Sequence, residues 1–171
     1  MDLSISVLFF VYLVNIFLLI FVLCYKRIQK SWPFFWMLLL IIVWQTTELL
    51  NIIYLVQEDK NILLLGVQAG LLPALYLAPV FVKLVFSLFD KWEHISRLRK
   101  FLWYLPAIVM SGLVFTSYNV KEVIITGDRF FYIAGPIYLV FAVYFVLLMS
   151  YGLYILAKNR QTAGPIVRRQ I

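Results

Sequence analysis

The sequence predicts an all-α membrane protein: a bundle of five transmembrane helices, with the N-terminus outside the cell and the C-terminus inside. Three observations predict it, namely the apolar composition, five apolar windows of spanning length, and the placement of the basic residues. Hydrophobic residues make up 64% of the 171 residues and charged residues 13%. Soluble domains have about 45–50% and about 25%. The composition therefore indicates an integral membrane protein.

Five windows are long enough to cross about 30 Å of hydrocarbon at about 1.5 Å per residue. They cover residues 4–25, 33–56, 61–89, 101–118 and 130–157. The first window has an acidic residue before it and its positive charges after it. This is the reverse of a signal peptide, so the first helix is expected to be retained. Because the connections are short, residues 1–171 are predicted to form a single transmembrane domain.

The basic residues predict the orientation. Eleven of the fifteen Lys and Arg residues form three clusters, which follow the first, third and fifth windows: Lys26, Arg27, Lys30; Lys91, Arg97, Arg99, Lys100; and Lys158, Arg160, Arg168, Arg169. The other loops hold only Lys60, Lys121 and Arg129. Because positive residues are retained on the cytoplasmic side, the clustered loops are predicted to lie inside. The net charge of +7 then faces anionic lipid, so membrane lipids are expected partners and nucleic acid is not.

The third window has a repeated pattern of small residues. They recur every four positions, at Gly66, Gly70, Ala74 and Ala78. Such a ridge lets another helix approach closely. The partner helix could come from the same chain or from a second copy.

Glu48 is the acidic residue that lies inside a window, where an ionised carboxylate costs about 2.5–3.5 kcal/mol. Gln45 and Asn51 lie three residues before and after it on overlapping arcs of the predicted helix, and Trp44 lies one turn away. Gln68 reaches a similar depth in the third window. We therefore predict a polar cluster of Gln45, Glu48, Asn51 and Gln68, with Trp44 beside it, as the ligand-binding candidates.

Two interpretations of this cluster stay open. In the first, the polar groups satisfy one another and fasten the second helix to the third, at about 1 kcal/mol per hydrogen bond. In the second, they form a ligand or ion site. Asn15 in the first window is expected to form an interhelical hydrogen bond, and Lys83 is expected to extend toward the inner headgroups.

The sequence predicts no catalytic site. Proteolysis inside a membrane needs a nucleophile with a base or paired aspartates, and neither pattern occurs within the windows. The chain also has no phosphate-binding glycine loop, no HExxH motif and no metal-ligand spacing. We therefore expect a protein that is not an enzyme, without metal or cofactor.

Several short motifs, in order, resemble the N-terminal seven-transmembrane sensor region of bacterial histidine kinases. They are Trp44-Gln-Thr-Thr-Glu48-Leu-Leu, the stretch from Gly66 to Pro79 leading to Phe86-Ser-Leu-Phe89, Tyr104-Leu-Pro106, Gly135-Pro-Ile-Tyr138, and Arg168-Arg-Gln170-Ile. The resemblance covers nearly the whole chain. Unlike the family, this sequence stops after five predicted helices, so it is expected to be a truncated or a reduced version.

The resemblance implies a sensor of bacterial two-component signalling in the cell membrane, usually a dimer, that acts on a cytoplasmic output domain or protein. The preferred function is therefore a non-catalytic membrane-embedded sensory domain, which relays an extracellular or membrane stimulus. The alternative is a small transporter subunit or partial transporter that uses the intramembrane carboxylate of Glu48. Inverted internal repeats would favour the alternative, and none is convincing.

Overall fold

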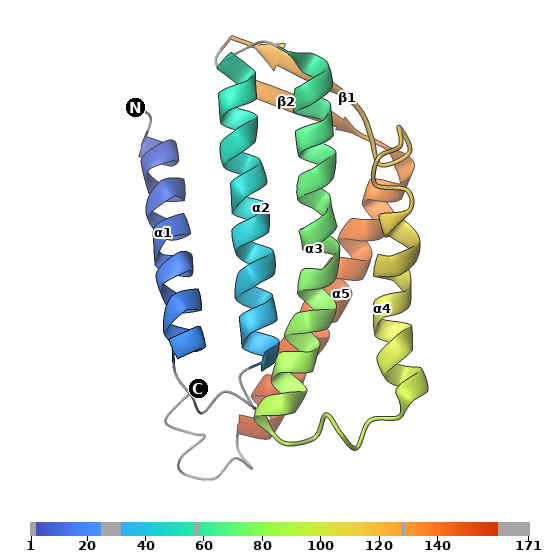
Figure 1. Cartoon of the computed structure of the whole chain (residues 1–171). Helices are drawn as coiled ribbons and strands as arrows, with labels where there is room; N and C mark the ends of the chain where they lie inside the picture. Colours follow the sequence, from blue (N-terminus) through green and yellow to red (C-terminus); the bar gives the residue numbers. More distant parts are fainter. Residues whose placement is uncertain (1–2, 25–31, 57–58, 128, 161–171) are drawn as a thin grey trace.

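The computed structural model describes residues 3–24, 32–56, 59–127 and 129–160. Five helices and one β-hairpin make up this part of the chain, and Figure 1 shows their arrangement. In chain order the elements are α1 (Leu3–Cys24), α2 (Trp32–Val56), α3 (Lys60–Leu88), α4 (Arg97–Ser111), β1 (Val120–Thr126), β2 (Arg129–Ala134) and α5 (Pro136–Arg160). Five of the basic residues that predict the orientation lie outside the described residues, namely Lys26, Arg27, Lys30, Arg168 and Arg169.

The helices run alternately up and down one common axis (Figure 1). The second helix and α5 both pack on α3, while α1 packs on α2 at one edge of the bundle. The hairpin lies across the end of the bundle where α2 ends and α3 begins. We call this end the hairpin end. The opposite end, where α3 ends and α4 begins, is called the basic end because Lys91, Arg97, Arg99 and Lys100 lie there.

The central helix of the bundle is α3. Of its apolar window 56% is buried, compared with 6% for α1, 17% for α2 and 11% for α5. The predicted ridge of small residues faces α2 in its first half, because Gly66 packs against Asn51 and Gly70 against Thr47. Ala74 and Ala78 are also buried. The partner of the first half of the ridge is therefore a helix of the same chain.

Four of the described helices are long and apolar enough to cross a membrane, and α4 is not among them. The predicted window 101–118 was wrong in its bounds, since α4 covers Arg97–Ser111. Ser96 caps its start by accepting a hydrogen bond from the Arg99 amide. After Ser111 the backbone forms a series of turns closed by bonds such as Leu113 N–H to Met110 carbonyl. The Thr116 hydroxyl also bonds to the Leu113 carbonyl, which favours turns over a continued helix.

The prediction of an outer loop up to residue 129 and a helix from 130 was also wrong. Residues 120–126 and 129–134 form an antiparallel hairpin in which Val123 pairs with Tyr132 and Ile124 with Phe131. The reason is the run of β-branched and aromatic residues on both sides of a turn that contains Gly127 at φ +61°. The last helix begins only at Pro136, whose fixed φ suits the first helical position.

Candidate functional site

The four polar residues predicted to form one cluster turn toward three different neighbours. Gln45 faces α1, where its Oε1 accepts a hydrogen bond from Asn15 Nδ2 at 3.0 Å. Asn51 is fully buried against Gly66 of α3. Gln68 Nε2 donates to the Val120 carbonyl of β1 at 3.5 Å. The predicted cluster therefore does not assemble, and each of these amides connects a different pair of elements.

The separation follows from helix geometry. Successive steps of three residues turn about 60° around a helix, so Gln45 and Asn51 lie about 120° apart, on either side of Glu48. The sequence gives this angle, but it does not give the position of each neighbouring helix. With α1 on one side of α2 and α3 on the other, the two amides are directed to different partners.

Gln68 helps to hold the hairpin on the bundle. Its bond to β1 is buried, and beside it Leu63 and Val67 of α3 form an apolar cluster with Val120 and Val123 of β1. The hairpin is thus fixed to α3 by one polar and several apolar contacts. This fixation places β2 next to the face of α2 that carries Glu48.

Asn51 differs from the other amides. Both polar atoms of its side chain are buried and have no hydrogen-bond partner among the described residues. A buried unpaired polar group costs about 1–3 kcal/mol. The close contact with Gly66 shows that the amide occupies the space which a larger residue on α3 would need.

Glu48 and Trp44 line a cavity of about 290 Å³. Its other walls come from α3, β2 and α5, and the residues are Val67, Gly70, Leu71, Ala74, Leu77, Tyr132, Tyr138, Phe141, Ala142, Phe145 and Val146. The cavity has the size of a small-molecule pocket and the usual composition, which is mostly apolar with a few polar groups. We call it the Glu48 pocket.

Three side chains that line the Glu48 pocket with the carboxyl group carry a polar N–H or O–H group. The Trp44 side chain, one turn earlier on α2, hydrogen-bonds to Glu48. On the other side, the hydroxyl groups of Tyr132 and Tyr138 lie 2.8 Å apart in a hydrogen bond, and their rings meet edge to face at 5.7 Å between centroids. The pocket therefore presents one carboxyl group together with three aromatic side chains that carry a polar N–H or O–H group.

Tyr132 belongs to the hairpin, and its ionisation is affected by the pocket. Burial raises the pKa of Tyr132, and the hydrogen bond with Tyr138 and the nearby negative charge of Glu48 act in the same direction. The phenol, which is neutral near pH 7 in any case, therefore keeps its hydrogen-bond donor at higher pH than an exposed tyrosine does. A neutral donor beside a carboxyl group suits the binding of a polar ligand group.

Tyr132, Tyr138 and Phe141 also belong to this site, although they were not among the candidates predicted from the sequence. In the sequence, Tyr138 belongs only to the motif that begins at Gly135, and Tyr132 falls at the start of the predicted window 130–157. One signal could have revealed the hairpin: two runs rich in β-branched and aromatic residues around Thr126-Gly127-Asp128. Among the described residues, no three His, Cys, Asp or Glu side chains are grouped as metal ligands.

Four long apolar helices beside a ligand-sized cavity are typical of a helical membrane protein. A comparison with family models narrows this class, because residues 7–171 match the N-terminal 7TM region of histidine kinase. The chain belongs to this family, and the resemblance seen in the sequence is confirmed. No curated protein and no solved structure matches the chain.

Family membership indicates a membrane sensory domain. The sensor region of histidine kinases is a non-catalytic domain, and the histidine-kinase context implies a cytoplasmic output domain. These statements apply to the class of domain.

Proposed function

We propose that this chain is a non-catalytic sensory domain of the cell membrane, and that the Glu48 pocket receives the stimulus. The observation that carries the proposal is the carboxyl group of Glu48 in a cavity with apolar and aromatic walls. A carboxyl group at this depth is costly, so its place in a cavity favours function over simple fastening of helices. Of the five candidates named from the sequence, only Trp44 and Glu48 line this pocket, whereas Gln45 bonds to α1, Asn51 packs against α3 and Gln68 bonds to β1.

The ligand is an amphipathic molecule with a cationic head. A carboxylate attracts a cation directly, and the faces of Trp and Tyr rings attract one by their quadrupoles. Trp44, Tyr132 and Tyr138 supply three such rings beside Glu48. The walls formed by Leu71 and Phe141, with their neighbours, suit an apolar tail.

The proposed topology is five crossings, with the hairpin end outside and the basic end inside. Lys91, Arg97, Arg99, Lys100 and Lys158 lie toward the basic end, while Lys121 lies on the hairpin. At 15 residues α4 covers about 22 Å, less than the hydrocarbon thickness. The turns after α4 complete the crossing, since irregular backbone is tolerated where its polar groups are paired, as in the bonds from the Thr116 amide to the Leu113 carbonyl and from the Ile137 amide to the Tyr118 carbonyl.

The relay uses the helices that meet at the pocket. The fifth helix begins beside the hairpin and ends at the basic end (Figure 1), so a ligand that moves its start also moves the part nearest the output. The helix is tied to α4 by the Tyr144 hydroxyl, which donates to the Trp103 carbonyl at 2.9 Å. A ligand shifts such an equilibrium only if it binds one of the two states more tightly.

The experiment uses the purified chain in lipid nanodiscs with 5-fluorotryptophan in place of tryptophan. Each Trp then gives a ¹⁹F NMR signal, and single Trp→Phe variants assign them. Hexyltrimethylammonium is titrated, with hexanesulfonate as the probe of opposite charge. We expect the cation to shift the Trp44 signal and, through the relay, the Trp103 signal at the other end.

Glu48→Gln is expected to weaken the binding of the cationic probe by about tenfold or more. The matched control is Glu122→Gln, which removes an exposed carboxylate of β1 that does not line the pocket. Equal responses to cation and anion, or full binding by Glu48→Gln, would refute the site. A Trp44 shift without a Trp103 shift would refute the relay.

The transporter alternative is favoured by the same carboxyl group in a cavity. It predicts flux of the cationic probe into proteoliposomes, which Glu48→Gln abolishes. The sensory proposal predicts binding without flux. Measuring both in one lipid composition separates the two functions.

A further inference from the structure

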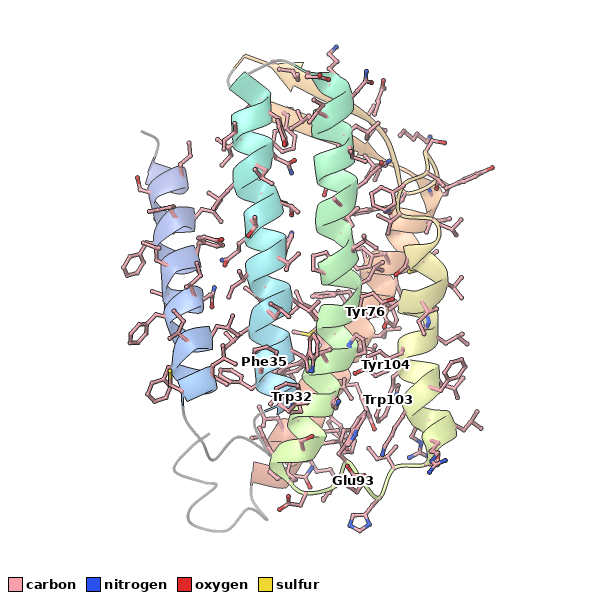
Figure 2. All side chains as sticks on the ribbon, viewed as in Figure 1. Trp32, Phe35, Tyr76, Glu93, Trp103 and Tyr104 are labelled. Atoms are coloured by element: carbon pink, nitrogen blue, oxygen red, sulfur yellow. The ribbon has the colours of Figure 1, made fainter. Side chains whose placement is uncertain are left out.

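A second cavity, of about 310 Å³, lies at the basic end. It is lined by Trp32 and Pro33 of α2, Lys83 and Ser87 of α3, and Asp90, Trp92 and Glu93 of the segment that follows α3. Figure 2 shows Trp32 and Glu93 at this end of the bundle. None of its lining residues belongs to the Glu48 pocket. We call this cavity the basic-end pocket.

The cation of the basic-end pocket is Lys83. Its side chain begins inside α3 and extends toward the basic end, where Nζ lies 5.7 Å from the centre of the Trp92 ring. Lys100 Nζ lies 4.9 Å from the same ring. A cation–π contact attracts the ammonium group as a whole, so its N–H donors can still reach the oxygen atoms of a ligand. Ser87 adds a hydroxyl donor one turn further along α3.

The same pocket also contains two carboxylates. Asp90 follows the end of α3 in a left-handed backbone conformation, at φ +56°. Glu93 lies three residues later and pairs with Lys100 at 3.9 Å, with its side chain 88% exposed. A pocket with a cation on a helix and carboxylates on the adjoining segment is complementary to a ligand that carries both charges.

We propose that the basic-end pocket binds the headgroup of a phospholipid that carries a phosphate and a primary amine, as in phosphatidylethanolamine. The phosphate bonds to Lys83 and Ser87, and the ammonium group bonds to Asp90 and Glu93. A choline headgroup has no N–H donors for these carboxylates, and a glycerol headgroup has no positive charge. Trp32 and Trp92 lie at the two sides of the pocket, and such rings prefer the headgroup depth of a membrane.

The test measures lipid retention by native mass spectrometry of the purified chain. The protein is equilibrated with equal amounts of phosphatidylethanolamine, phosphatidylcholine and phosphatidylglycerol with identical acyl chains. We expect about fivefold more retained phosphatidylethanolamine than either other lipid. Asp90→Asn should remove the preference over phosphatidylcholine, and asparagine also tolerates the left-handed conformation of this position. Lys83→Gln should reduce retention of all three lipids.

Arg97→Gln is the control, because it removes one positive charge at the same end without touching the pocket. Glu93→Gln changes an exposed side chain and so tests the amine contact with little risk to folding. Equal retention of the three lipids, or an Arg97→Gln effect as large as that of Lys83→Gln, overturns the proposal. Soluble O-phosphoethanolamine that binds as well as the lipid would assign the pocket to a free metabolite and overturn the lipid assignment.

Discussion

The Glu48 pocket and the basic-end pocket have similar volumes, about 290 and about 310 Å³, but opposite chemistry. The first holds a single carboxyl group among aromatic and aliphatic side chains. The second holds a lysine and two carboxylates with only two aromatic rings and one proline. Both are built on α3, which contributes Val67 to Leu77 to the first and Lys83 and Ser87 to the second.

The difference shows how depth selects side chains. In the span, one charge is compensated by aromatic edges and a hydrogen-bonded pair of tyrosines, because water is scarce there. At the basic end, charges of both signs are close together and partly exposed, because water and headgroups reduce their cost. A ligand with an apolar body therefore suits the Glu48 pocket, and a zwitterionic headgroup suits the basic-end pocket.

The largest expected effect separates the two pockets by disturbing only the hairpin end. In Gly135→Ala, the new Cβ would overlap the Tyr118 carbonyl, a backbone atom that cannot rotate away. We expect destabilisation by about 3 kcal/mol, seen as a lower midpoint of thermal unfolding in detergent. Because Tyr132 and Tyr138 flank Gly135, the cationic probe should bind more weakly, while lipid retention at the basic end should be unchanged.

Gly112→Ala is the matched control for that variant, since its nearest new neighbour lies at an ordinary 3.5 Å. It should leave the unfolding midpoint, the binding of the cationic probe and the retention of lipid unchanged. An unaltered midpoint in Gly135→Ala would contradict the close packing of the hairpin against the turns after α4.

A smaller effect is expected where α2 packs on α3 beside the Glu48 pocket. Gly66→Ala places a Cβ against the Asn51 amide, so the amide must move, and we expect a loss of about 2 kcal/mol. Asn51→Ala should be nearly neutral alone, because its amide has no partner among the described residues. The double variant should be more stable, by about 1 kcal/mol or more, than the sum of the two single losses in unfolding free energy predicts. Additive effects in thermal unfolding would contradict the contact.

The smallest expected effect is a pH dependence confined to the hairpin end. Because the pKa of Tyr132 is raised in the folded protein above its usual 10.0, its contribution to stability is complete below pH 10 and is lost as the pH rises through the folded value. Tyr132→Phe should therefore lose less stability than the wild type between pH 9 and pH 11. Unfolding midpoints across this range would measure the difference. Parallel curves would contradict the burial of this phenol.

Much of the fold could be predicted from the sequence, because a membrane span depends on local composition. The helices α1, α2 and α3 lie within a few residues of the predicted windows, and the four-residue repeat of small residues located a packing face of α3. The region from Gly112 to Gly135 could not be predicted in the same way. Its apolar runs, at residues 123–125 and 130–134, are short, and hydropathy alone does not distinguish a short strand from part of a helix.

The candidate site was predictable only in part. Glu48 and Trp44 stand out because a carboxyl group inside an apolar window is costly, and that cost is visible in the sequence. Their partners Tyr132 and Tyr138 are far along the chain, and apolar windows contain many tyrosines that look equivalent. The sequence predicted one cluster because Gln45 and Asn51 flank Glu48 on α2 and Gln68 lies at a similar depth on α3. Spacing and depth do not show in which direction each neighbouring element lies.

The sequence by itself determined that this is a membrane protein of the histidine-kinase sensor family, with an acidic residue at an unfavourable depth and its basic residues concentrated in three segments. These properties depend on local composition and on the positions of charged residues along the chain, so they can be read without knowledge of the fold. Only the tertiary structure decided which side chains meet Glu48, and that Lys83, Asp90 and Glu93 share a second cavity. Such meetings depend on the rotation of each helix against its neighbours and on a hairpin that folds back over the bundle, and these are set by packing across the whole chain.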